Sequence, residues 1–161
     1  MTELDYTHCV NEYADNIYRF VLKNIKNEFD AQDVVQSSYE KLWIHKEKVD
    51  AASAKSYLFT IAYHQLIDMV RKNKKSGHDE VEKANNLSTF QEPSSIKKVL
   101  DKAMQSLTAL QKSLVLLKDY EGYSYAEIAD ITSLNETQVK VYLHRARLVL
   151  KNYIGKKENA Y

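Results

Sequence analysis

Apolar residues recur at the spacing of an α-helix throughout the first half of the chain. Positions three and four apart share one helix face, so such a stripe predicts a helix that buries one side. A break at 27–30 separates the first stripe from the second, and Asp30 is the expected N-cap of the second helix. The pattern predicts three to four helices, with these inward residues: Ile17, Phe20, Val21 and Ile25; Val35, Tyr39, Leu42 and Trp43; Leu58, Ile61, Ala62, Leu66 and Met69.

The second half carries three signals for the start of a helix. In a capping box, an N-cap side chain and a Glu or Gln three residues later satisfy two backbone N–H groups that otherwise lack partners. A short connection between two such helices is typical of a helix-turn-helix, and only 132–135 separate the last two. The three boxes are Thr108 with Gln111, Ser124 with Glu127, and Asn135 with Gln138.

Between the two halves lies a stretch without helical periodicity, 76–95. It contains the only Pro, one of the 3 Gly residues and several Ser and Asn residues, a composition typical of a linker. We therefore expect two small domains, one at 5–75 and the other at 96–155. Strands and their turns normally use more Gly and Pro than the 3 and 1 found in these 161 residues, so the expected fold is all-α.

The composition also limits the chemistry that the chain can perform. Cys9 is the only cysteine, so an intramolecular disulfide and a multi-thiolate zinc site are excluded, and Cys9 is expected to be a small buried residue. No signal peptide or membrane-spanning run is recognisable, which favours a cytoplasmic protein. No metal site, cofactor or catalytic centre is expected, because no phosphate loop or nucleophile motif occurs and the histidines lack metal-ligand spacing: His8, His45, His64, His78 and His144.

The net charge of +1 hides an uneven distribution of charged residues. Acidic residues outnumber basic ones through Asp50, whereas 55–78 holds five Lys and Arg residues against Asp68 alone. A second basic block, 140–157, closes the chain. Two separate electropositive surfaces are the expected footprint of a protein that contacts nucleic acid at two places.

The helix predicted after Asn135 has a distinct outward face. Its apolar residues Val139, Leu143, Ala146 and Leu150 share one side, which turns Thr137, Gln138, Val141, His144, Arg145 and Leu148 to the other, with Lys140 beside them. Arg and Gln side chains can make two hydrogen bonds to a base edge, and Val can pack against a thymine methyl group. The alternative interpretation is an ordinary solvated helix face.

The second half resembles the promoter-binding fourth region of bacterial sigma factors. The resemblance rests on LTALQKSLVLL (107–117), EGYSYAEIA (121–129) and QVKVYLHRAR (138–147). The chain departs from the usual family pattern at Thr108, Lys112, Ser133 and Gln138, where Pro, Arg, Gly and Thr are common. The resemblance implies contacts to the −35 promoter element from Lys118, Tyr125, Gln138, Lys140, Val141, His144 and Arg145.

The first half is similar to sigma region 2. The segment DAQDVVQSSYEKLW (30–43) resembles the helix that grips the polymerase clamp, which implies polymerase contacts by Asp33, Gln36, Glu40 and Trp43. For Trp43 a place in the core is the preferred alternative. The segment SYLFTIAYHQLIDMVRK (56–72) resembles the part that opens and reads the −10 element, where rings stack on bases and cations follow the backbone. The implied −10 residues are Lys55, Phe59, Tyr63, His64, Arg71, Lys72 and Lys74.

Some aromatic residues of this segment have a second interpretation. Phe59 and Tyr63 fit the core as well as they fit a DNA strand, and Tyr57 is assigned to the core. His64 stands where the family commonly has Asn.

Together the two resemblances identify the chain as a member of the extracytoplasmic-function group of sigma factors. The implied protein is a non-enzymatic initiation subunit that binds the clamp and flap of core RNA polymerase, promoter DNA and an anti-sigma factor. Two alternatives compete with it. One is a helix-turn-helix regulator whose first half dimerises or senses a ligand, and the other is a helical nucleotide hydrolase, which requires clustered acidic residues or histidines that the sequence lacks.

Overall fold

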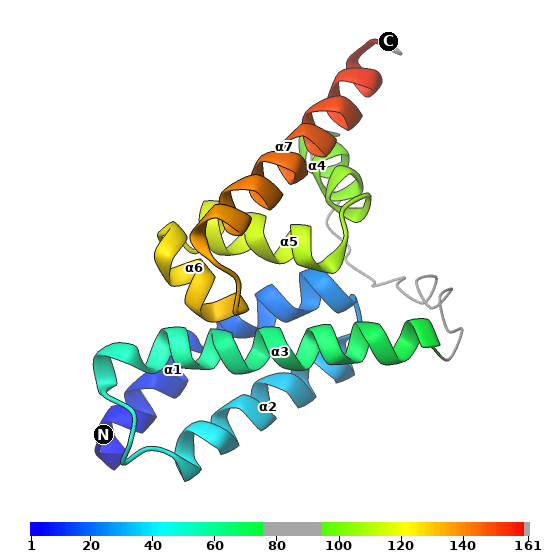
Figure 1. Ribbon diagram of the computed structural model, residues 1–161. Helices are drawn as coiled ribbons and strands as arrows, with labels where there is room; N and C mark the ends of the chain where they lie inside the picture. Colours follow the sequence, from blue (N-terminus) through cyan, green and yellow to red (C-terminus); the bar gives the residue numbers. More distant parts are fainter. Residues whose placement is uncertain (76–94, 160–161) are drawn as a thin grey trace. The chain divides into compact units, whose positions relative to one another are not determined.

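The computed structural model describes residues 1–75 and 95–159 and is all-α in these ranges, as predicted. Side chains are described for 1–74 and 95–156. Two short segments accompany the helices, the 3₁₀ turn η1 (Ala51–Ser53) and the π-helical segment η3 (Leu116–Tyr120). The α-helices are labelled in Figure 1: α1 (Glu3–Ile25), α2 (Glu28–Ile44), α3 (Ala54–Lys75), α4 (Ser95–Gln105), α5 (Ala109–Val115), α6 (Tyr125–Thr132) and α7 (Glu136–Asn159).

The chain forms two compact units. The first contains α1, α2 and α3, and the second contains α4, α5, η3, most of α6 and α7. The predicted linker at 76–95 lies outside the described residues except for its last position. Within the described ranges, no helix combines the length and the apolar run that crossing a bilayer requires.

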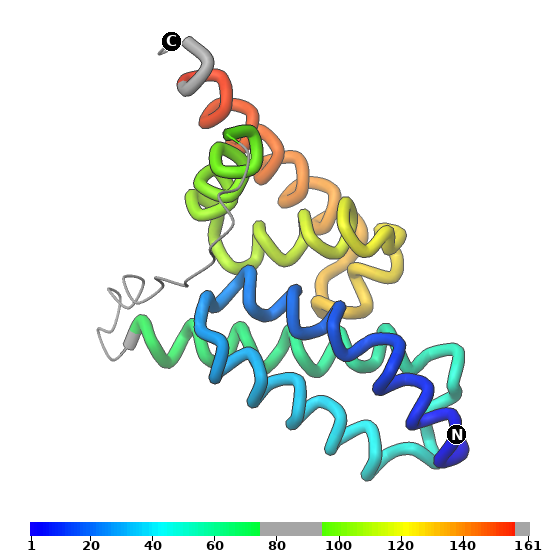
Figure 2. Tube along the Cα trace, turned by 180° about the vertical axis from the view of Figure 1, so that it is seen from behind, coloured from blue at the N-terminus to red at the C-terminus, as the bar shows by residue number. Residues whose placement is uncertain are grey.

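In the first unit, α1, α2 and α3 pack against one another in pairs, and all three tubes can be followed in Figure 2. The rings of Phe20 and Phe59 meet edge to face inside this bundle, with centroids 5.3 Å apart. Val34 is buried whereas Val35 is half-buried, so the core stripe of α2 contains Val34 in place of the predicted Val35 and begins at Ala31. The remaining core residues of the three helices include Ile17, Val21, Ala31, Leu42, Leu58, Ala62 and Leu66.

The start of α2 corrects one prediction. Asn27 is the N-cap, because its side chain accepts a hydrogen bond from the backbone N–H of Asp30 at 3.0 Å. Asp30 instead lies in the first turn of the helix, where its negative charge interacts favourably with the positive end of the helix dipole. An Asn and an Asp three residues apart are both good capping residues, so the sequence pattern alone does not choose between them.

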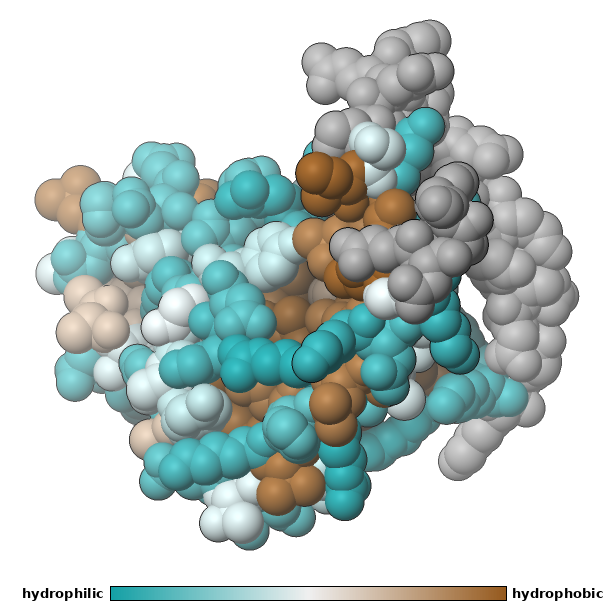
Figure 3. Space-filling model, turned by 90° about the horizontal axis from the view of Figure 1, so that it is seen from above, coloured by the Kyte–Doolittle hydropathy of each residue, from teal (hydrophilic) through white to brown (hydrophobic). Residues whose placement is uncertain are grey.

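In the second unit, α7 packs against α4 and α5. The chain continues from α5 through η3 to Gly122, whose φ of 76° suits a residue without a side chain and ends the helix as predicted. The predicted capping boxes at Thr108, Ser124 and Asn135 are all present. Hydrophilic side chains cover most of the surface shown in Figure 3, with apolar residues visible between them.

Candidate nucleic-acid interface

One face of α2 presents the polar residues that the sequence singled out for polymerase contacts. Asp33, Gln36 and Glu40 are all exposed, and their spacing places them along one stripe of the helix. The Nε2 atom of Gln36 donates a weak hydrogen bond to Oε1 of Glu40 at 3.4 Å. The stripe therefore offers two carboxylates and an amide to a partner without disturbing the core.

Trp43 continues this stripe and is not a core residue, which corrects the preferred interpretation of its sequence position. Its side chain is 41% exposed. The Tyr6 ring contacts it edge to face with centroids 4.9 Å apart, and the Nζ atom of Lys46 lies 3.4 Å from the centre of its ring. An ammonium over an indole is a favourable cation–π geometry. The contacts with Lys46 and Tyr6 therefore fix the Trp43 ring at the surface, outside the core.

Beside Trp43 is an open depression lined by Tyr6, Glu40, Trp43 and Ile44. Ile44 is 71% exposed and was not among the residues predicted from the sequence. A signal existed, because Ile44 falls outside the apolar stripe of α2 and so has no place in the core. Exposed apolar side chains grouped with an aromatic ring are typical of a protein-binding surface.

Two hydrogen bonds, one part-buried and one buried, hold the Tyr6 side of this depression. The Tyr6 hydroxyl donates to the carbonyl of Tyr39 at 3.2 Å, and the Tyr39 hydroxyl donates to the carbonyl of Cys9 at 2.7 Å. Burial raises the pKa of Tyr39 well above its ordinary value, with a smaller contribution from neighbouring groups. Cys9 is buried, as predicted. The carbonyl of Cys9 therefore helps to hold Tyr39 in place, while the buried thiol is not part of the exposed site.

Two aromatic residues predicted to stack on DNA bases lie in the core. Phe59 is fully buried against Phe20, and Tyr63 is 6% exposed, with a pKa raised by burial. Base stacking needs an accessible ring face, so in this conformation both residues take the core position that the sequence left open as the alternative. Tyr57, which was assigned to the core, is only half-buried.

The polar side chains predicted to meet the −10 element fall into two groups. His64, Arg71, Lys72 and Lys74 are exposed on α3, and Nδ1 of His64 lies 2.7 Å from the carbonyl of Thr60. Lys55 is separate, because it is half-buried at the start of the helix, with Nζ 5.8 Å from the centre of the Tyr13 ring. The second half of α3 is therefore the basic surface of this unit.

The helices α6 and α7 form the predicted helix-turn-helix. The turn contains Ser133, whose φ of 61° lies in the left-handed region that Gly adopts most easily. The sequence departs from the family pattern at this position, and the backbone shows why Gly is common there. A single residue in this conformation costs about 1–2 kcal/mol, which the packed helices on either side can offset.

The face of α7 agrees with the predicted pattern. Val139, Leu143 and Ala146 are buried, and Leu150 is half-buried. On the other side Thr137, Val141, His144, Arg145 and Leu148 are exposed, while Gln138 at the edge of this face is half-buried. Val141 and Leu148 on this face are 41% and 44% exposed.

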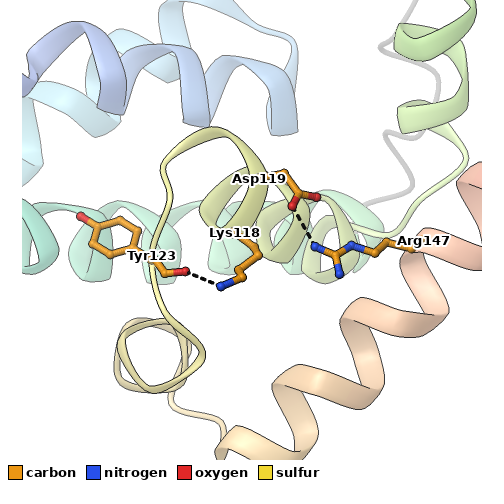
Figure 4. A network of polar contacts seen from close by, with 4 residues as sticks. All are labelled: Lys118, Asp119, Tyr123 and Arg147. Carbon is orange, nitrogen blue, oxygen red and sulfur yellow. Dashed lines mark hydrogen bonds and ion pairs between the residues drawn. The ribbon is translucent and has the colours of Figure 1, made fainter.

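Lys118, Tyr125 and Lys140 come together from three different elements. The Tyr125 ring centre lies 4.4 Å from Nζ of Lys118 and 5.3 Å from Nζ of Lys140. Lys118 also donates to the carbonyl of Tyr123 at 3.3 Å, which Figure 4 shows. The ring attracts both ammonium groups, so two positive charges are held close together beside α7.

An ion pair beside this cluster was not predicted from the sequence. Arg147 of α7 donates to Asp119 of η3 at 2.8 Å, and Figure 4 shows the two side chains reaching toward each other. The two residues are far apart in the sequence, so no local sequence pattern predicts the ion pair. Arg147 is therefore partly neutralised, unlike Lys140 on the same flank of the helix, for which no carboxylate partner is found among the described residues.

Comparison with known protein families matches both units. The model of sigma-70 region 2 matches residues 9–76, and the model of sigma-70 region 4 matches residues 97–150. RNA polymerase sigma factor SigV of Bacillus subtilis (strain 168) is 30% identical over 151 residues, which cover 93% of this chain and 91% of SigV. The ECF RNA polymerase sigma factor SigM of the same organism is 31% identical over 86% of this chain and 88% of SigM.

The chain belongs to the extracytoplasmic-function group of RNA polymerase sigma factors. The sigma factor RpoE, in its co-crystal structure with the anti-sigma factor NepR from Bartonella quintana, has the same fold, with a TM-score of 0.74, 22% identity, and coverage of 94% of this chain and 97% of that one. Sigma factors are regulatory subunits of RNA polymerase that act in transcription initiation and bind DNA, and they are not enzymes.

Proposed function

We propose that this sigma factor binds core RNA polymerase through its first unit and directs it to promoters by contacting the −10 and −35 elements. The observation that carries the proposal is the face of α7. Three positions are buried on one side while Val141, His144 and Arg145 are exposed on the other, as a helix that reads a major groove requires.

The polymerase clamp binds the stripe of Asp33, Gln36 and Glu40 together with Trp43 and Ile44. This assignment is supported by the exposure of all five side chains and by the depression next to Trp43. Charged residues around an apolar centre are the usual anatomy of a protein interface. In this proposal the second unit also contacts the polymerase flap.

The −10 element meets α3, and the −35 element meets α7. His64, Arg71, Lys72 and Lys74 follow the −10 strand, because they form the exposed basic surface of the first unit. On the second unit, Lys118 and Lys140 contact phosphates, while Gln138, Val141, His144 and Arg145 face the bases. The domains carrying these roles are 5–75 and 96–155, with 76–95 as the linker.

An anti-sigma factor is the proposed inhibitory partner. RpoE was crystallised in complex with the anti-sigma factor NepR, and the fold that this chain shares with RpoE supports a comparable partner here. The proposed location is the cytoplasm, where bacterial RNA polymerase works.

Reconstitution tests the proposal directly. Core polymerase is mixed with the full chain, promoters are selected from a random DNA library, and the selected sequences are footprinted. We expect holoenzyme to protect both a −10 and a −35 element, and the free chain to protect neither at physiological salt, because each unit alone offers few phosphate contacts. Protection by the free chain alone, or a failure to bind core polymerase, would contradict the proposal.

A further inference from the structure

Three cationic side chains of α7 lie along one strip beside its exposed face. Lys140, Arg147 and Lys151 are all exposed, and their spacing in the sequence places them on the same side of the helix. From Lys140 to Lys151 an α-helix rises about 16 Å. In homeodomains, which use a variant of the helix-turn-helix, the later part of the recognition helix contacts the DNA backbone. The strip is therefore placed to run beside phosphates while the neighbouring face meets bases.

The middle member of this strip differs from the other two, because it has a carboxylate partner. The Nη2 atom of Arg147 donates to Oδ1 of Asp119 at 2.8 Å, a contact that Figure 4 shows. Among the residues whose side chains are described, neither Lys140 nor Lys151 forms an ion pair. The two lysines each add a positive charge to the strip, whereas Arg147 and Asp119 together add none.

Asp119 also follows directly after a residue of the lysine cluster. It is next to Lys118 in η3, and Lys118 shares the Tyr125 ring with Lys140. The Asp119 side chain is 44% exposed, so its negative charge is open to whatever binds at this surface. A carboxylate thus stands beside the cations that are assigned to phosphates in the proposed function.

The contact with Asp119 changes the charge at Arg147 and does not block its side chain. A guanidinium has several N–H donors in a planar fork, so one contact leaves others that can reach a phosphate. Affinity for DNA depends on how many phosphates the protein neutralises, because each one releases counterions. A phosphate that approaches Arg147 also approaches the Asp119 carboxylate, and two negative charges repel. The attraction by Arg147 is therefore opposed by its own partner.

We infer that Asp119 limits the affinity of the second unit for DNA, because its carboxylate cancels the charge of Arg147 on the phosphate-facing flank of α7. The inference rests on the proposed function, since it takes −35 DNA as the ligand of α7. Phosphate contacts are the same for every DNA sequence. Asp119 therefore weakens binding to all sequences and leaves a larger share of the affinity to the base contacts of the exposed face.

The salt dependence of DNA binding by assembled holoenzyme tests the inference. The probes are the −35 duplex that wild-type holoenzyme selects from a random library and a scrambled duplex of equal length, each titrated at several salt concentrations. We expect Asp119→Asn to bind both duplexes about two- to fivefold more tightly and to steepen the salt slope by about one, because the charge of Arg147 is no longer cancelled. Unchanged or weaker binding by Asp119→Asn would overturn the inference.

Two further variants show whether the effect passes through Arg147. Arg147→Gln leaves the carboxylate without its partner, so it should weaken binding to both duplexes by a similar factor. The double variant Asp119→Asn with Arg147→Gln is neutral at both positions and should return to the wild-type affinity and salt slope. If the double variant bound as weakly as Arg147→Gln, Arg147 would make a contact that Asp119 does not cancel, and the inference would be wrong.

Asp101→Asn is the matched control, because it removes the same charge from an exposed position of α4. It should leave affinity and salt slope unchanged, and a gain equal to that of Asp119→Asn would reduce the effect to net charge and overturn the inference. All variants should melt within a few degrees of wild type, since the pair is exposed. A wild-type holoenzyme that bound no −35 duplex would contradict the proposed function itself. Normal −35 binding that depends on Lys140 but not on Asp119 would overturn the inference alone.

Discussion

Asp119 and Arg147 join the π-helical segment η3 to α7 through a contact of 2.8 Å between a carboxylate oxygen and a guanidinium nitrogen. The side chains are 44% and 45% exposed, so water screens their attraction. We expect a double-mutant cycle with Asp119→Asn and Arg147→Gln to give a coupling energy of about 0.2–1 kcal/mol that shrinks at high salt. Urea unfolding at two salt concentrations measures it. A coupling above about 2 kcal/mol, insensitive to salt, would contradict a solvent-screened pair.

Phe59→Ala should act on stability and not on DNA contact. Phe59 is fully buried and packs on Phe20, so its truncation leaves a cavity and should cost about 3–5 kcal/mol of unfolding free energy. Transcription should then fall equally from a closed promoter and from one already mismatched across the −10 element. Phe59→Leu, which refills most of the space, is the control. If Phe59→Ala left the unfolding free energy unchanged and reduced transcription only from the closed promoter, Phe59 would be assigned to binding of the −10 strand.

Asp33→Arg should weaken binding to core polymerase about tenfold or more. The substitution places a positive charge against the clamp surface that, in the proposal, is complementary to the Asp33 carboxylate. Asp33 is exposed on α2, so circular dichroism should show unchanged helicity. Glu12→Arg makes the same charge reversal at an exposed position of α1 and should leave binding intact. Normal holoenzyme assembly by Asp33→Arg would remove α2 from the proposed interface.

Lys140→Ala and Arg145→Ala should differ in how they depend on DNA sequence. Lys140 lies beside the exposed face with its ammonium near Tyr125, so its loss should weaken binding about equally on preferred and scrambled −35 sequences and lower the salt slope by about one. Arg145 lies on the face, so its loss should cost about 1–3 kcal/mol on the preferred sequence and much less on a scrambled one. Holoenzyme titrations at several salt concentrations measure both effects.

Leu143→Ala is the control for these two variants. Leu143 is 1% exposed, so the cavity should cost about 2–5 kcal/mol and abolish both kinds of binding together. Equal losses by Lys140→Ala and Arg145→Ala on the two DNA sequences would show that α7 does not read bases.

Tyr39 should make the first unit sensitive to alkaline pH. Burial raises its pKa in the folded chain above the ordinary value of 10.0, so the neutral hydroxyl is favoured by folding. This contribution is complete below pH 10 and is lost as pH rises through the folded pKa, because the unfolded chain ionises first. Tyr39→Phe removes the hydrogen bond to the Cys9 carbonyl, should cost about 0.5–1.5 kcal/mol at neutral pH, and should flatten the fall above pH 10. Urea unfolding at pH 7 to 11 measures the difference, and identical pH profiles would contradict the assignment to Tyr39.

Features that depend on neighbouring residues could be predicted from the amino-acid order alone. The three capping boxes were predictable because each joins residues three positions apart, and the buried side of α7 was predictable because Val139, Leu143 and Ala146 repeat at the helical period. The all-α fold and the sigma-factor motifs were readable for the same reason, since they are continuous in the chain.

The packing of the helices settled which borderline aromatic residues are accessible and which distant side chains meet. Periodicity gives the direction of a side chain relative to its own helix, but whether Trp43 or Phe59 is covered depends on the helices packed beside it. The contacts of Tyr125 with Lys118 and Lys140 join three separate elements. Such contacts could not be predicted, because an interaction between residues distant in the chain leaves no periodic trace in the sequence.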